Sequence, residues 1–196
     1  MDRLRIGIAL YNSGWYLAAH EPLEALWLER PAGEREDYLQ GLIQATAAVH
    51  KSRNGNEAGA AGLAESARGY LNGCGDTAVD ALREWLGRLA ADPTLADGEV
   101  PPELRFDDEV VGIYDLRPDE IAHAAEAVAE ADGDELLETA AGYVTRDLAA
   151  GDESSPFVTL TLDYMRDPTA IVRQRLRERV ERRRARESDV EGLFKQ

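Results

Sequence analysis

Four polar side chains recur at four-residue spacing in two otherwise apolar stretches of the sequence. His20 and Glu24 lie in the first stretch, and Gln40 and Gln44 lie in the second. Residues four apart occupy one face of an α-helix, about 40° from each other. A buried polar group without a partner costs on the order of 1–3 kcal/mol, so these side chains must satisfy one another, bind a ligand or reach water. The pattern therefore predicts a site.

The two helices that carry these residues are predicted to form an antiparallel hairpin. A short turn near residues 31 and 32 separates them, so residues whose numbers sum to about 64 should lie at the same height. His20 would then face Gln44, and Glu24 would face Gln40. We expect the four side chains to converge.

Two interpretations of this cluster stay open. In the functional one, Glu24 is a carboxylate base or ligand with His20 as its partner, since adjacent imidazole and carboxylate groups are common in acid–base catalysis. In the structural one, Glu24 accepts hydrogen bonds from Gln40 and His20, Gln44 closes the ring, and Trp27 packs over it. A divalent metal ion is the candidate cofactor, with His20 and Glu24 as metal ligands. A catalytic zinc normally has three protein ligands, and these two residues are one too few.

The charge balance is strongly acidic. The chain has 38 acidic and 22 basic residues and a net charge of −16, and its lysines are only Lys51 and Lys195. This composition resembles that of proteins from salt-loving archaea, in which the Debye length falls to about 3 Å at 1 M salt and self-repulsion is screened. We therefore expect a halophilic, acidic protein. Its negative field disfavours nucleic acid as a partner.

The sequence carries no sign of export or of a disulfide. Cys74 is the single cysteine, and no Cys/His spacing suits zinc. Arg3 and Arg5 interrupt any apolar N-terminal run, and no stretch approaches the ~20 apolar residues of a membrane span. We expect a soluble, cytoplasmic protein that has no membrane partner. A small molecule or another protein stays open as partner, and the oligomeric state is not given by the sequence.

Hydrophobic periodicity and turn residues predict a helical protein. The expected helices cover residues 2–12, 15–29, 34–51, 57–72, 118–131 and 134–149, and a further long helix is capped by Asp76 or Thr77 and carries an apolar stripe from Val79 to Leu89. Val110–Tyr114 and Phe157–Leu162 are β-branched and aromatic enough for short strands, and an extended strap across a helical body is the alternative. The predicted fold class is all-α: an N-terminal antiparallel helical bundle with a helical C-terminal extension and minor β structure at most.

Prolines and acidic residues gather in residues 92–108, which predicts a linker. We expect a bundle over residues 1–91, this linker, and an extension over residues 109–196 that ends in an arginine-rich helix. Residues 170–187 hold eight Arg and three Glu. Such a helix could dock on the acidic body or contact phosphates. Alternatively it is a solvated helix whose apolar stripe packs down, with the stripe formed by Ile171, Val172, Leu176 and Val180.

Several motifs together resemble one family. They are Leu10-Tyr11-Asn12-x-Gly14-x-Tyr16, Ala19-His20-Glu21-x-Leu23-Glu24-x-x-Trp27, Leu39-Gln40-Gly41-Leu42-Ile43-Gln44 and Gly55-Asn56-x-x-Gly59-Ala60. On these residues, positions 6–75 resemble the family catalogued as domain of unknown function 309. The resemblance implies a small all-helical protein and carries the label of a predicted metal-dependent hydrolase. It implies a polar core, a second wall and a rim, formed by His20, Glu21 and Glu24, by Gln40 and Gln44, and by His50 and Asn56.

Two function classes follow from these observations. The first is a helical protein with a polar pocket that binds a metal or a small molecule, a hydrolase by resemblance alone, with His20, Glu21 and Glu24 as catalytic candidates. The pocket would be completed by Gln40, Gln44, Trp27, His50 and Asn56. The second is a non-catalytic helical protein-interaction module whose polar network is purely structural. Gly14-Trp15-Tyr16 before a helical hairpin is similar to tetratricopeptide hairpins, although no repeat of 34 residues is present.

Overall fold

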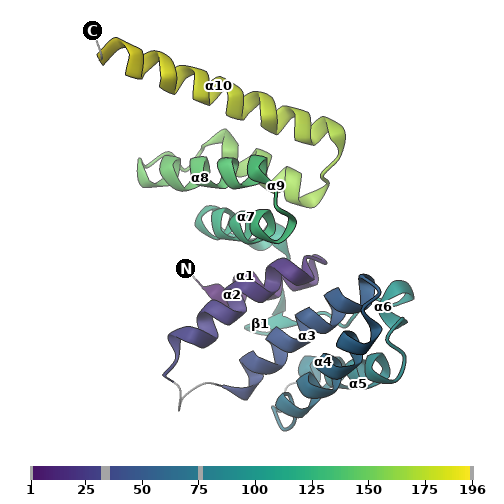
Figure 1. Ribbon diagram of the computed structural model, residues 1–196. Coiled ribbons are helices and arrows are strands. Elements are labelled where there is room, and N and C mark those ends of the chain that lie inside the picture. Colours follow the sequence, from purple (N-terminus) through teal and green to yellow (C-terminus); the bar gives the residue numbers. More distant parts are fainter. Residues whose placement is uncertain (1, 32–35, 75–76, 195–196) are drawn as a thin grey trace. The chain divides into compact units, whose positions relative to one another are not determined.

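The computed structural model of the protein describes residues 2–31, 36–74 and 77–194, with Thr77 and residues 190–194 given only as parts of their helices. The chain divides into two compact units, Met1–Asp115 and Leu116–Gln196, called unit 1 and unit 2 below. Helices dominate both units, and among the described residues the strands form one two-stranded antiparallel hairpin (Figure 1). The predicted all-α fold class is confirmed.

Unit 1 begins with five helices, each packed against the next along the chain (Figure 1). These are α1 (Arg3–Asn12), α2 (Tyr16–Glu29), α3 (Asp37–Arg53), α4 (Glu57–Tyr70) and α5 (Thr77–Ala91). A short helix, a hairpin and a turn of 3-10 helix follow, namely α6 (Leu95–Gly98), β1 (Arg105–Phe106), β2 (Glu109–Val110) and η1 (Ile113–Asp115). The predicted helices of this region therefore exist, with bounds that differ by a few residues.

Small residues allow the helices of unit 1 to approach closely. A Cβ added to Gly7 in α1 would lie 2.6 Å from the Leu23 side chain of α2, and one added to Gly41 in α3 would lie 2.6 Å from Leu71. Both distances are shorter than any real contact, so these positions require glycine. In α4 the inward positions are alanines with no exposed surface, Ala60, Ala64 and Ala67. These small side chains allow α4 to pack closely against α3 and α5.

Residues 92–108 lie within unit 1. Ala96 and Leu104 in this segment are buried. The strands β1 and β2 pair with Phe106 opposite Glu109, joined by Asp107 and Asp108 at φ of 51° and 66°. Positive φ at both central residues is the geometry of a tight hairpin turn, which Asp tolerates better than most residues. The unit boundary falls after Asp115, and the division into bundle, linker and extension stays a prediction about which parts fold alone.

Unit 2 consists of four helices, α7 (Pro118–Asp132), α8 (Glu135–Ala149), α9 (Pro156–Arg166) and α10 (Ala170–Phe194). The first two form a hairpin, as expected from the sequence. Gly133 ends α7 in the left-handed conformation, and the Asp134 carboxylate caps α8 by accepting from the amides of Leu136 and Leu137. Glycine after a helix and Asp before the next one are the residues that such a turn favours.

The strand prediction for Phe157–Leu162 is wrong, because this segment lies in α9. Ser155 precedes it, and its hydroxyl oxygen accepts from the Phe157 amide at 3.2 Å. Pro156 occupies the first helical position, where the missing N–H costs nothing. This start signal outweighs the weak β preference of the residues that follow.

The longest helix, α10, buries little apolar surface. Leu176 and Val180 are buried, as predicted, while Val172 is half-buried and Ile171 is 67% exposed. Two of the four residues of the predicted apolar stripe are therefore buried. No helix in the described ranges is long and apolar enough to cross a membrane.

A carboxylate at the start of α8 anchors the beginning of α10. Asp134 accepts from the Arg173 guanidinium at 2.6 Å and from the Tyr164 hydroxyl at 2.5 Å. Burial raises the pKa of the Asp134 carboxyl, but the bonds from Tyr164 and Arg173 outweigh burial and hold that pKa below its usual range. Burial and the bond to Asp134 together raise the pKa of Tyr164 to about 12. The three groups form one coupled, charged contact.

A second carboxylate, at the end of α8, anchors the middle of α10. Asp147 is buried and accepts from the Ser155 hydroxyl at 2.7 Å and from the Arg183 guanidinium at 3.0 Å. Arg183 also donates to Glu187 at 3.0 Å. Ion pairs therefore do most of the work of holding α10 on unit 2, whereas the other helices of this unit are held mainly by apolar contacts.

Candidate functional site

The predicted imidazole–carboxylate pair lies on α2. His20 Nδ1 is 3.8 Å from Glu24 Oε2, and the two side chains are 32% and 51% exposed. This separation is too long for a hydrogen bond and fits a loose ion pair in contact with water. An exposed pair of this kind contributes little to stability. It is reachable by a ligand, but it is not held in one geometry.

The two glutamines lie on α3, on either side of Gly41 in the sequence. Gln44 comes three residues after Gly41, whose missing Cβ faces Leu71 at the end of α4. At about 100° per residue these positions are about 60° apart, so Gln44 lies on the α4 side of α3, and Gln40 is within one turn of it. Both are half-buried, and Gln44 Oε1 is buried without a hydrogen-bond partner in the described part of the chain.

No hydrogen bond among the described residues joins either glutamine to His20 or Glu24. The pocket that the sequence predicted between α2 and α3 is therefore not supported, and neither is the closed structural network. The cause is the connection: α2 ends at Glu29 and α3 begins at Asp37, further apart than the assumed turn. The equal-height partners shift by about two residues. Residues 32–35 lie outside the described residues.

The remaining predicted site residues lie on α2, in the last turn of α3 and directly before α4. Glu21 is exposed and Trp27 half-buried, both on α2. His50 lies in the last turn of α3, with its ring 3.4 Å from the Asn54 amide nitrogen. Asn56 caps α4 by accepting from the Gly59 amide at 3.0 Å, a structural task that its position before a helical run could have indicated.

Neither unit provides enough ligands for a metal centre among its described residues. Over residues 2–31, 36–74 and 77–189 no group of three or more His, Cys, Asp or Glu side chains could hold a metal ion. His20 and Glu24 supply two donors on an exposed helix face. These residues do not fit the three-ligand zinc site of a hydrolase.

The most specific polar contact in unit 1 involves Asn12, at the end of α1. Its amide nitrogen donates to the carbonyls of Leu104 and Val111, both at 2.9 Å, and its amide oxygen accepts from the Leu104 N–H at 2.9 Å. One side chain thus makes three hydrogen bonds to the backbone of a segment more than 90 residues later. Such use of donor and acceptor together fixes both position and direction of that segment.

The neighbours of Asn12 contact the same segment. Tyr11 donates its hydroxyl to the Pro102 carbonyl at 3.1 Å, and the Ser13 hydroxyl oxygen accepts from the Ile113 amide at 3.1 Å. Burial raises the pKa of the Tyr11 phenol well above its usual value, which keeps the hydroxyl a donor. We call Tyr11, Asn12 and Ser13 the clamp. All its bonds go to backbone atoms.

The segment held by the clamp, residues 101–113, is called the strap below. It carries four buried apolar side chains, Pro101, Leu104, Val111 and Ile113. Arg5 of α1 lies over the ring of Phe106 at 5.8 Å and donates to the Asp115 carbonyl. The strap therefore combines backbone recognition with apolar anchors. Sequence reasoning offered a strap as an alternative for Val110–Tyr114, but it read Asn12 only as part of a motif.

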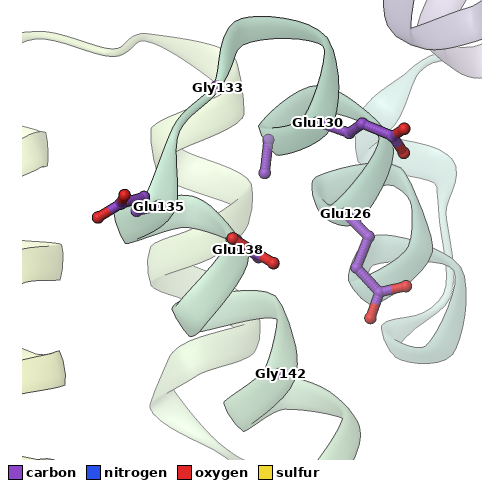
Figure 2. A pocket seen from close by; sticks show the side chains of 7 residues that line it. Glu126, Glu130, Gly133, Glu135, Glu138 and Gly142 are labelled. Atoms are coloured by element: carbon purple, nitrogen blue, oxygen red, sulfur yellow. The ribbon is translucent and has the colours of Figure 1, made fainter.

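An acidic cleft of about 700 Å³ lies on the α7–α8 hairpin of unit 2 (Figure 2). It is lined by Glu126, Ala129, Glu130, Gly133, Glu135, Glu138 and Gly142. Figure 2 shows that the carboxylates do not converge: Glu135 points away from Glu126 and Glu130. Glu126 is also 3.2 Å from His123. The cleft attracts cations in general and has no chelating geometry.

Comparison with known proteins gives one match. Residues 4–63 match the family model described as Domain of unknown function (DUF309). No curated protein and no solved structure matches the chain. The sequence is thus similar to that family over less than a third of its length.

The matched range includes the clamp and the His20–Glu24 pair, while the strap lies beyond it. Asn12 is therefore a family-like residue whose partners come from a segment that the match does not cover. The clamp therefore lies inside the family-matched range, and the strap that it binds lies outside that range.

Proposed function

We propose that unit 1 is a non-catalytic helical scaffold that binds a polypeptide hairpin by its backbone, and that the strap, which turns back at Asp107 and Asp108, is its resident hairpin. The single observation behind the proposal is the set of three hydrogen bonds from Asn12 to Leu104 and Val111. A side chain that donates to and accepts from the backbone on both arms of a distant hairpin can recognise that backbone without contacting its side chains.

The apolar side chains of the strap supply selectivity. Backbone bonds accept any residue type, whereas buried pockets select side chains. Leu104 and Val111, each 2% exposed, are buried beside the Asn12 bonds. A competing segment would need an apolar residue at both places and free backbone groups between them.

An exchange experiment tests the proposal. The full chain with Leu104→Ser and Val111→Ser weakens the resident strap while leaving the clamp intact. A labelled peptide of residues 99–114 is then titrated and followed by fluorescence anisotropy. We expect the double variant to bind the peptide at least about tenfold more tightly than the wild-type chain, whose site is occupied.

Adding Asn12→Ala to the double variant should abolish peptide binding. The single variant Leu104→Ser provides the same comparison if the double variant loses its helical circular dichroism. If a folded variant with a weakened strap does not bind the peptide, the strap is a fixed part of the fold and the proposal fails.

A metal-dependent hydrolase, which the family resemblance implies, is the second candidate, although His20 and Glu24 in the family-matched range supply two donors where a zinc hydrolase needs three. Protein purified without chelators would contain stoichiometric metal that His20→Ala and Glu24→Gln remove. Unchanged metal content in the variants would eliminate this candidate.

The acidic, lysine-poor composition supports a further part of the proposal, that the protein works in a high-salt cytoplasm. Its melting temperature should then rise between about 0.1 and 2 M KCl as self-repulsion is screened. A fall in melting temperature over that range would contradict it.

A further inference from the structure

The arginines of α10 are sorted by direction around the helix. One face docks through Leu176 and Val180, with Arg173 bound to the half-buried carboxylate of Asp134 and Arg183 bound to the buried carboxylate of Asp147. Two of the eight arginines in residues 170–187 are thus committed to anchoring.

A second set forms a continuous edge. Arg175, Arg179, Arg182 and Arg186 follow each other at spacings of four, three and four residues. At about 100° per residue they fall within one sector of about 60°, and no other residue of positions 170–189 falls in that sector. The set spans about 16 Å along the axis. We call these four residues the arginine edge.

The edge is accessible and partly preorganised. Arg175, Arg182 and Arg186 are exposed. The Nε groups of Arg182 and Arg186 donate to the carbonyls one turn earlier, of Glu178 and Arg182, at 3.0 and 3.3 Å. These bonds orient the guanidinium groups in series along the helix and leave the terminal nitrogens for other partners.

The two remaining contacts of the edge are weak. Arg182 is 4.0 Å from Glu178, and both side chains are more than half exposed. Arg179 lies 5.6 Å from the centre of the Phe157 ring, which supports the guanidinium without neutralising it. The edge therefore keeps most of its positive charge at the surface.

We propose that the arginine edge binds the phosphate backbone of double-stranded nucleic acid. Guanidinium groups bind phosphate oxygens through two parallel hydrogen bonds, which ammonium groups cannot do. One strand of a duplex carries one phosphate per 3.4 Å of the duplex axis, so an edge of about 16 Å can reach several phosphates of one strand. The negative net charge of the chain disfavours nucleic acid as a partner. The structure, however, places four arginines together along one edge of α10, and this local positive charge is not evident from the net charge.

The opposite side of α10 provides a matched control. Arg177 and Arg184 form a shorter edge with Arg173, and Arg184 donates to the Thr139 hydroxyl at 3.1 Å. Replacing these two residues removes the same charge as replacing Arg182 and Arg186. It also removes one docking contact, so a loss of binding caused by a loosened α10 would show in the control.

The experiment compares the full-length wild type, Arg182→Gln with Arg186→Gln, and Arg177→Gln with Arg184→Gln. Binding to a fluorescent DNA duplex of about 20 base pairs is measured by anisotropy between about 50 and 200 mM salt. We expect the edge variant to bind at least about tenfold more weakly, with the slope of log K against log salt reduced by about 1.8 for two lost phosphate contacts. The control should stay within about twofold of the wild type.

Three outcomes would overturn the proposal. The wild type fails to bind the duplex, or both variants lose affinity equally, which would mean a response to net charge alone. The third is a change of molecular mass in the edge variant, seen by light scattering without DNA. It would assign the edge to self-association, with the acidic cleft of a second copy as its partner.

Discussion

The strap of unit 1 and the α10 helix of unit 2 are both held on their units by a few polar side chains, but the chemistry differs. Asn12 holds the strap through neutral groups and three backbone bonds. Arg173 and Arg183 hold α10 through charge, on Asp134 and Asp147. Neutral bonds respond little to pH or salt, whereas charged ones titrate and are screened. The contacts that hold the strap in unit 1 should therefore change little with pH and salt, whereas the contacts that hold α10 in unit 2 should weaken when pH or salt changes.

Asn12→Ala is expected to have the largest effect on this comparison. It removes three hydrogen bonds at about 0.5–1.5 kcal/mol each, so unit 1 should lose about 1.5–4.5 kcal/mol of unfolding free energy. Trp15, Trp27 and Trp85 all lie in unit 1, so tryptophan fluorescence during urea unfolding measures that unit.

Asn12→Asp is the matched control. It keeps the acceptor but turns a carboxylate oxygen toward two carbonyls, so it should be at least as destabilising as alanine near neutral pH. An Asp variant of wild-type stability would show that the donor bonds to Leu104 and Val111 contribute nothing.

Arg183→Ala should have the next largest effect, because it leaves the buried Asp147 carboxylate with only the Ser155 bond. Charged hydrogen bonds contribute about 1.5–3 kcal/mol, and the one-third exposure of Arg183 reduces this to about 1–2 kcal/mol. Amide hydrogen exchange of α10 should accelerate correspondingly, while tryptophan fluorescence stays unchanged.

Arg177→Ala serves as the comparison variant, since Arg177 makes no ion pair with a described residue. Equal exchange in both variants would remove the electrostatic explanation of docking.

The pH dependence follows from the coupled contact at Asp134. Its folded pKa is lowered, so the stabilisation is present above the unfolded pKa of about 3.9 and is lost as pH falls through the folded value. Tyr164 has its pKa raised to about 12, so its contribution is complete below about pH 10 and is lost as pH rises toward 12. Exchange protection of α10 should therefore fall in acid and in strong base.

Over the same pH range the Asn12 bonds should persist, because amides do not titrate. Protection of the Leu104 amide, which donates to Asn12, provides the internal reference. Parallel loss of both signals would show that the two units do not differ in the way stated above.

Glu24→Gln should have the smallest effect. The Glu24 side chain is half exposed and 3.8 Å from His20, and exposed ion pairs contribute about 0–1 kcal/mol. We expect a change below about 0.5 kcal/mol in urea unfolding, with Glu21→Gln on the same helix as the comparison. A larger loss confined to Glu24 would mean that this side chain has a fixed partner after all.

Local signals predicted the helices well. The Gly133-Asp134 turn and the apolar periodicity act within one or two turns of chain, so one sequence suffices to read them. The strand prediction at Phe157 failed only because residue preference was weighed above the cap that precedes it.

Contacts between distant residues could not be predicted in the same way. The facing of Gln44 and His20 depended on the length of one connection, and a shift of about two residues was enough to remove the predicted pocket. The Asn12 bonds span more than 90 residues, so nothing near Asn12 in the sequence indicates what it binds. The clamp became visible only with the fold.

The long reach of the clamp sets an order of events during synthesis. Ile113 meets Ser13, and Val111 meets Asn12, across about a hundred residues, so α1 must wait for most of unit 1 to leave the ribosome before its polar end is satisfied. Contacts this far apart in the chain slow folding, since the intervening loop must be closed first. A nascent chain halted before residue 101 would display Tyr11 and Asn12 unoccupied, open to whatever polypeptide is nearby.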